Sequence, residues 1–128
     1  AVLAANGEVI GVFPEDLNPY ETKHPQLSKL YRVNTIHERK ALMTELSDGF
    51  ITFPGGFGTL EEAMEIWSGI KIGLIKKPLG ILNIAGYYDL LLKFLQHTVT
   101  TGLTKQEHID LVAVSDDPIR LLDTMLSS

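Results

Sequence analysis

The chain has 128 residues, of which 45% are hydrophobic, and a formal net charge of −5 at pH 7. This length supports one hydrophobic core, so we expect a single domain over residues 1–128. The acidic balance argues against nucleic-acid binding. No apolar run has the length of a membrane span, and no signal-peptide pattern is present, so we expect a soluble protein. The absence of cysteine excludes disulfides and thiol catalysis and fits a cytoplasmic location.

The predicted elements alternate along the chain. The first residues resemble the end of a helix capped by Gly7, and we expect an upstream strand–helix unit to be missing from this sequence. Strands are expected at residues 8–13, 31–33, 49–53, 78–83 and 108–114, with a polar loop at 18–26. Helices are expected at residues 35–47, 59 to about 74, 87 to about 100 (capped by Gly102), and from Pro118 to about 126. This alternation predicts an α/β fold with a doubly wound parallel sheet, Rossmann-like, in three α/β/α layers.

Residues 49–62 form the most informative segment. An apolar run ends at Pro54, and glycines follow at 55, 56 and 58 before Thr59 opens a helix. A strand–glycine loop–helix turn gathers free backbone N–H groups where a phosphate can bind, and here Glu61 and Glu62 follow directly behind it. A structural interpretation competes, because Thr59 to Glu62 also fits a capping box in which Glu62 reaches back to Thr59. The loop by itself leaves both interpretations open.

The helix before this segment carries an arginine among apolar residues. Ile36, Leu42, Met43 and Leu46 share one face at helical spacing, and Arg39 projects from the middle of that face. A guanidinium on a core-facing stripe needs a carboxylate or phosphate partner. One interpretation is a buried Arg–Glu salt bridge. The other is that Arg39 reaches the pocket of Glu62, which would suit a phosphorylated substrate.

Three motifs carry a family resemblance. Pro54-Gly-Gly-Phe-Gly-Thr-Leu-Glu-Glu62 resembles the PGGxGTxxE pattern of the LOG family, the cytokinin riboside 5′-monophosphate phosphoribohydrolases, many of which carry the older label "lysine decarboxylase-like". His37-Glu-Arg-Lys-Ala-Leu-Met43 is similar to the second motif of the family. Leu82-Asn83 with Gly86-Tyr87-Tyr88 is similar to the third. The resemblance runs from about Gly7 to the C-terminus.

The resemblance implies hydrolysis of the N-glycosidic bond of a nucleoside 5′-monophosphate, either a cytokinin riboside monophosphate or AMP, to free base and ribose 5-phosphate. It implies no cofactor and no metal ion, and a homodimer with the site near the subunit interface. Arg39 and Glu62 would be the catalytic pair, while the glycine loop would hold the 5′-phosphate and Lys40 would add positive charge. The residues implied to bind substrate are Glu21, Lys40, Gly55, Gly56, Phe57, Gly58, Thr59, Leu60, Glu61 and Ser68.

Several assignments keep an alternative. Glu21 matches a substrate-contacting glutamate of the family but also reads as an ordinary surface-loop acid. Ser68 stands where many members have threonine, and the glycine-rich segment that usually follows the first strand is missing. Tyr87 and Tyr88 are interpreted as residues that pack a helix start.

The activity itself has two alternatives. One is a nucleotide carrier or sensor of the same fold without turnover. The other is a pyridoxal-phosphate lysine decarboxylase, which requires a Schiff-base lysine in a dedicated pocket. We do not favour it, because none of the candidate lysines has such a context: Lys71, Lys76, Lys77 and Lys93.

Overall fold

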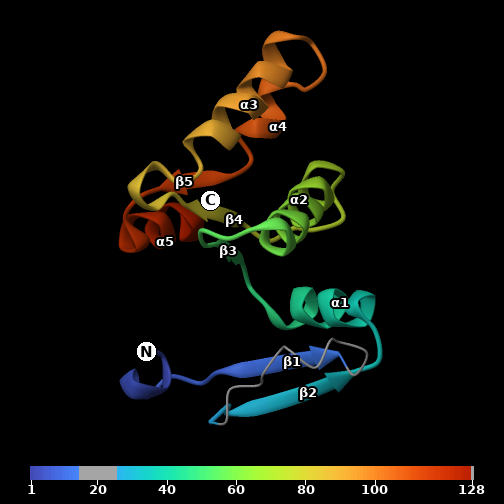
Figure 1. Cartoon of the computed structure of the whole chain (residues 1–128), viewed down its shortest axis with the longest axis vertical. Helices are drawn as coiled ribbons and strands as arrows, with labels where there is room; N and C mark the ends of the chain where they lie inside the picture. The colour runs from blue at the N-terminus through green and yellow to red at the C-terminus, as the bar shows by residue number, and fades with distance from the viewer. Residues whose placement is uncertain (15–25, 128) are drawn as a thin grey trace. The chain divides into compact units, whose positions relative to one another are not determined.

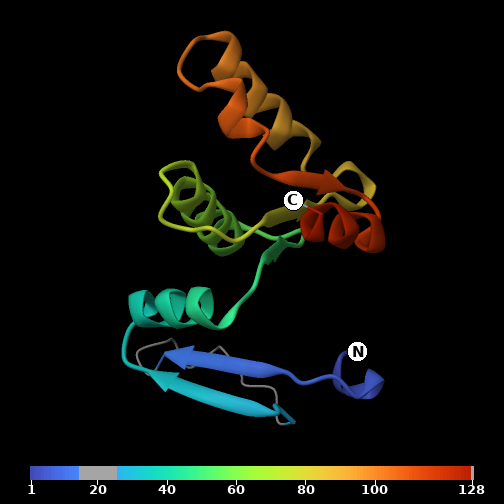
Figure 2. The ribbon, with the colours of Figure 1, turned by 180° about the vertical axis from the view of Figure 1, so that it is seen from behind.

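The structure is a computed structural model that describes residues 1–14 and 26–127, and it divides into two compact units, Ala1–Ser47 and Asp48–Ser128. Figures 1 and 2 show the helices and parallel strands of each unit. Both units are α/β in construction, as predicted. The single domain expected over residues 1–128 stays a prediction. Among the described helices, none combines the length and the apolar character that crossing a bilayer requires.

The first unit is built on two parallel strands. Strand β1 (Ile10–Pro14) pairs with β2 (Lys29–Val33), and helix α1 (Ile36–Leu46) packs against both strands. A short 3-10 helix, η1 (Leu3–Ala5), precedes β1. It ends at Asn6, which has a φ of 61°, so the prediction of Gly7 as the cap is wrong. Asparagine serves here because it tolerates the left-handed region better than other residues with a side chain.

Helix α1 begins with two side-chain caps, which differ from a capping box in that Glu38 bonds the residue before the N-cap. The side chain of Thr35 accepts a hydrogen bond from the Glu38 N–H at 3.1 Å, and the Glu38 carboxylate accepts one from the Asn34 N–H at 2.7 Å. The apolar stripe predicted for this helix is only partly buried, since Ile36 and Leu46 are 42% and 44% exposed. The two-stranded sheet of this unit is too narrow to cover the whole stripe.

The second unit has a three-stranded parallel sheet in the order β3-β4-β5. Its strands are β3 (Phe50–Thr52), β4 (Leu79–Leu82) and β5 (Ala113–Ser115). Side chains of β4 alternate between the two faces, as the period of a strand requires. Leu79 and Ile81 join one hydrophobic cluster, and Leu82 joins another.

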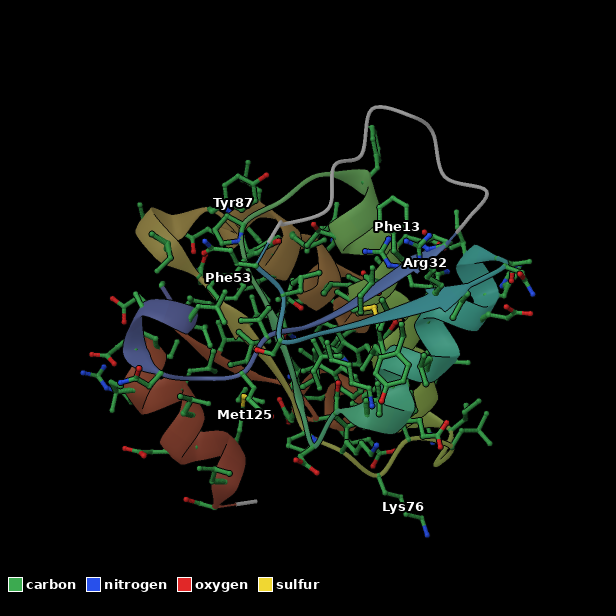
Figure 3. All side chains as sticks on the ribbon, turned by 90° about the horizontal axis from the view of Figure 1, so that it is seen from below. Phe13, Arg32, Phe53, Lys76, Tyr87 and Met125 are labelled. Atoms are coloured by element: carbon green, nitrogen blue, oxygen red, sulfur yellow. The ribbon has the colours of Figure 1, made fainter. Side chains whose placement is uncertain are left out.

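Helices cover both faces of this sheet, as Figures 1 and 2 show. Helices α2 (Phe57–Lys71) and α3 (Asp89–Thr100) pack on the Leu79 side. Helix α5 (Pro118–Leu126) packs on the other side through Leu121 and Met125, and Met125 is labelled in Figure 3. The predicted three-layer α/β/α arrangement is therefore confirmed in this unit.

Two predicted elements differ from the structure. The strand expected over residues 108–114 is wrong in its first half, because α4 (Gln106–Ile109) is helical and only β5 extends beside β4. The carbonyl of His108 accepts a hydrogen bond from the Trp67 indole at 2.8 Å and so is used outside the sheet. The helix expected from residue 87 begins at Asp89, because η2 (Ile84–Gly86), with Ala85 at a φ of 51°, comes first.

The end of α3 follows its prediction. Gly102 has a φ of 81°, and its N–H donates to the Val99 carbonyl while that of Leu103 donates to the Thr98 carbonyl. This pair of bonds is a Schellman motif, which favours glycine because other residues strain in the left-handed region.

Candidate active site

The candidate site begins where β3 passes into α2. Gly56 is the N-cap of α2 and offers no side chain, and the Leu60 N–H makes the first bond of the helix, to the Gly56 carbonyl at 3.0 Å. The described part of the chain supplies no acceptor for the N–H groups of Phe57, Gly58 or Thr59. A helix start with unpaired N–H groups carries a partial positive charge and attracts an anion.

The capping box, which was the competing interpretation of Thr59 and Glu62, does not form. Helix α2 begins at Phe57, so Thr59 lies inside its first turn and Glu62 lies too far along the helix to reach back. The glycines let the chain enter the helix two residues earlier than predicted. The Thr59 side chain instead packs on Gly55, where an added Cβ would lie 2.7 Å from the Thr59 Cβ.

The three glycines of the loop have different structural reasons. Gly55 is required by its contact with Thr59. At Gly56 and Gly58 an added Cβ would meet no atom within 4 Å, and neither residue has a positive φ. Gly56 is the N-cap, a position where glycine is favoured over alanine, whereas Gly58 lies in the first turn, where alanine is the better helix former. The fold therefore gives a reason for Gly55 and for Gly56 but none for Gly58, and open space lies beside the free N–H groups at Gly56 and Gly58.

The remaining loop and helix residues face different surroundings. Glu62 is half-buried about one helical turn beyond Gly58, and within residues 1–14 and 26–127 its carboxylate has no hydrogen-bond or ion-pair partner. Glu61 is exposed, and Leu60 packs on the core. Phe57, the first residue of α2, is 94% exposed.

Two tyrosines that the sequence analysis interpreted as packing a helix start hold this loop in place. The Tyr87 hydroxyl donates to the Gly55 carbonyl at 2.6 Å, and the Tyr88 hydroxyl donates to the Phe53 carbonyl at 2.6 Å. Tyr87 and Phe53 are labelled in Figure 3. Burial raises the pKa of the Tyr88 hydroxyl, Tyr87 raises it further, and a hydrogen bond with the Gly55 backbone opposes both. The sequence contained a signal for this contact. Both tyrosines follow the strand predicted after the glycine-loop strand, and the carboxyl ends of parallel strands lie at the same edge of a sheet.

Arg39 lies in the first unit. It is half-buried and lines a cavity of about 270 Å³ with Met43 and residues of β1. Its Nε is buried and has no hydrogen-bond partner among the residues that the structure describes. Lys40, beside it, is half-buried. Because each unit is described by itself, the pairing of Arg39 with Glu62 stays a prediction, and Glu21 lies outside the described residues.

Ser68 lies farther along α2, about 13 Å of helix rise from Thr59. It is exposed and lines a cavity of about 120 Å³ between α2, α3 and α4, together with Trp67, Lys71 and His108. A substrate role for Ser68 stays a prediction. The described residues contain no group of three or more His, Asp or Glu side chains that could hold a metal ion.

Fold and site together define the class: an α/β protein with a glycine loop and an uncapped helix start at the carboxyl end of a parallel strand, where such sheets bind ligands. A profile of the family described as "Possible lysine decarboxylase" matches residues 1–125. The chain belongs to this family, which is the LOG family that its motifs resemble.

Curated relatives extend this result. The chain is 40% identical over 117 residues to the "Probable cytokinin riboside 5'-monophosphate phosphoribohydrolase LOGL9" of Oryza sativa subsp. japonica, which covers 91% of this chain and 52% of the relative. It is 40% identical over 107 residues to LOG of the same plant, an alignment that covers 84% of this chain and 44% of LOG. It is 42% identical over 111 residues to LOG5 of Arabidopsis thaliana, an alignment that covers 85% of this chain and 49% of LOG5. Both of these are named as cytokinin riboside 5'-monophosphate phosphoribohydrolases. The chain thus spans about half the length of these relatives.

Proposed function

We propose that the protein to which this chain belongs hydrolyses the N-glycosidic bond of nucleoside 5′-monophosphates and releases a free base and ribose 5-phosphate. The observation that carries the proposal is the start of α2: a glycine loop with free N–H groups and open space, and the unpartnered, half-buried Glu62 one turn behind it. The names of the curated relatives support the same reaction and point to a cytokinin riboside 5′-monophosphate as a substrate, and AMP is the second substrate that we propose.

The chemistry assigns separate tasks to the two ends of this site. The N–H groups at Gly56, Phe57 and Gly58 would bind the 5′-phosphate, with the positive end of the helix contributing. Glu62, one turn on, would then lie toward the ribose. Cleavage passes through an oxocarbenium-like state, which a nearby carboxylate stabilises while it orients or deprotonates a water molecule. The water oxygen bonds to C1′, and the base departs with the electron pair of the broken bond and takes up a proton.

The phosphate lies far from the breaking bond, and this suits its task. Binding energy from a remote group can hold the sugar where the carboxylate and the water reach C1′. Arg39 would hold the phosphate, orient Glu62, or do both. Its buried Nε supports a role with an anionic partner, because a buried guanidinium nitrogen left without a hydrogen bond is unfavourable.

The substitution Glu62→Gln tests this proposal. Glutamine keeps the size of the side chain but cannot accept a proton or stabilise a cation by charge, so kcat for AMP or isopentenyladenosine 5′-monophosphate should fall by roughly 10²- to 10⁴-fold. Glu62 takes no part in a helix cap, so the melting temperature should hold. The matched control is Glu65→Gln, an exposed glutamate on the same helix, which should keep wild-type turnover.

Free base and ribose 5-phosphate are measured by chromatography with the full-length protein. Full turnover in Glu62→Gln would show that this carboxylate is not the catalytic group. A folded wild-type protein that binds AMP without releasing base would instead be a nucleotide-binding module.

We propose further that the protein works as a cytoplasmic homodimer. Exposed apolar side chains on α3, Leu90 at 81% and Phe94 at 59%, support a protein–protein contact, because such residues favour burial at an interface. The absence of cysteine fits a reducing compartment. Light scattering on the full-length protein tests the dimer, and imaging of a tagged copy in the source cell tests the location.

A further inference from the structure

The turn after β4 reaches back to the glycine loop through two phenol groups. Tyr87 donates to the Gly55 carbonyl and Tyr88 to the Phe53 carbonyl, each at 2.6 Å. The two rings pack edge to face with their centroids 4.9 Å apart. The two hydrogen bonds hold carbonyls on either side of Pro54, so they fix the loop where it leaves the sheet.

The bond from Tyr87 also sets the direction of one N–H group. A peptide unit is planar and trans, so its carbonyl and the following N–H point in opposite directions. Because the Gly55 carbonyl points at the Tyr87 hydroxyl, the Gly56 N–H points away from it. Glycines stand on both sides of this peptide, and glycine tolerates nearly any φ and ψ, so without an anchor the unit rotates easily.

Tyr88 holds a peptide of another kind. The residue after Phe53 is Pro54, which has no N–H, so the bond to the Phe53 carbonyl orients no donor. The Tyr88 hydroxyl also hydrogen-bonds the Gly55 backbone, and that backbone group is turned toward the phenol and not toward a ligand. Tyr88 is also 3% exposed and belongs to the core cluster beside α2, whereas Tyr87 is 55% exposed. The two neighbouring tyrosines thus make similar bonds with different consequences.

The turn that carries the tyrosines is itself fixed. The Asn83 side chain accepts a hydrogen bond from the Tyr88 N–H at 2.7 Å and donates one to Asp89 at 2.8 Å. Gly86 has a φ of 71°, and a Cβ there would lie 2.6 Å from an Asp89 oxygen. The third motif of the sequence therefore builds a rigid support for Tyr87.

We propose that Tyr87 is a positioning residue for the phosphate site: it locks the Gly55–Gly56 peptide so that the Gly56 N–H faces the anion. This inference rests on the proposed function, because it assigns Tyr87 a task at the same site. It separates the two tyrosines by role, Tyr87 for the direction of a donor and Tyr88 for the stability of the unit.

The test compares Tyr87→Phe with its matched control Tyr88→Phe in the full-length protein. Tyr87→Phe should raise the Kd for inorganic phosphate roughly three- to tenfold, the effect of one lost hydrogen bond, and leave the melting temperature nearly unchanged. Tyr88→Phe should lower the melting temperature by roughly 4–10 °C and change the Kd by less than about twofold. With AMP, Tyr87→Phe should raise KM and leave kcat near the wild-type value, as expected when only uniform binding is lost.

A second readout follows the donor directly. In ¹⁵N-labelled wild-type protein the Gly56 amide resonance should shift on addition of phosphate, and Tyr87→Phe should reduce this shift. The inference is overturned if Tyr87→Phe leaves the Kd and the Gly56 shift unchanged, or if both variants weaken phosphate binding equally. A wild-type protein that neither binds phosphate nor hydrolyses AMP would overturn the proposed function and this inference together. If the wild type turns over AMP normally and Tyr87→Phe changes neither the Kd for phosphate nor the Gly56 shift, only the inference is overturned.

Discussion

Substituting Gly55 and Gly58 one at a time separates a glycine that the fold needs from one that only a ligand explains. In Gly55→Ala the new methyl group would lie 2.7 Å from the Thr59 Cβ and 3.0 Å from its Cγ2. Threonine is branched at Cβ and has few rotamers in a helix, so it cannot turn aside cheaply. Overpacking of this kind destabilises by about 1–3 kcal/mol, which lowers the melting temperature by roughly 3–15 °C in a protein of this size.

Gly58→Ala is the matched comparison. An added Cβ meets nothing within 4 Å at Gly58, and alanine is the better helix former by up to about 1 kcal/mol. The melting temperature should therefore hold or rise. If the open space belongs to the phosphate, the same methyl group should raise KM for AMP or the Kd for phosphate.

The assay is thermal unfolding followed by circular dichroism, together with phosphate binding by calorimetry. A stable Gly55→Ala variant would refute the steric reasoning about Thr59. A Gly58→Ala variant that binds phosphate as the wild type does would refute the interpretation that an anion occupies this space.

Two further predictions concern α5. Gly80→Ala places a methyl group 2.5 Å from the Met125 Sδ and 2.9 Å from the Cδ1 of the buried Leu121. The free energy of unfolding in urea should therefore fall by about 1–3 kcal/mol. An unchanged midpoint of unfolding would contradict this packing. Hydrogen bonds from the N–H groups of Arg120 and Ile119 lower the pKa of Asp117, so its stabilising effect is complete above the ordinary value of 3.8 and is lost as the pH falls through the lowered one. Asp117→Asn keeps a capping side chain without this titration, so its melting temperature should fall less than that of the wild type on acidification below about pH 4.

Local signals in the sequence predicted most of the fold. The Asp117–Pro118 start of α5, the Gly102 end of α3 and the alternation of strands with helices are all confirmed. Each depends on the conformational preference of a few adjacent residues, which tertiary contacts leave unchanged here. The strand expected around His108 failed because its carbonyl bonds to Trp67, 41 positions away, and no local pattern reports such a partner.

One pattern occurs twice and gives two structures. Thr35 and Glu38 both cap the start of α1, whereas Thr59 and Glu62 have the same spacing and cap nothing. The difference lies in what precedes the threonine, since Gly56 starts α2 early and leaves Thr59 inside the helix. The glycine loop and Glu62 were therefore found from the sequence, but the reason for each glycine needed the neighbouring atoms.

The tyrosines of the third motif also bear on how the site assembles. Tyr87 and Tyr88 lie 32 and 35 positions after the carbonyls they hold, and the whole of α2 and β4 lies between them. Contacts across such separations form only after the intervening chain has been brought together. The glycine segment therefore does not hold its donors in place by local contacts alone, because the two tyrosine bonds need the turn after β4 beside it. A designer who moved residues 49–71 onto another scaffold would carry the motif but not the orientation of its donors, unless the turn after β4 moved with it.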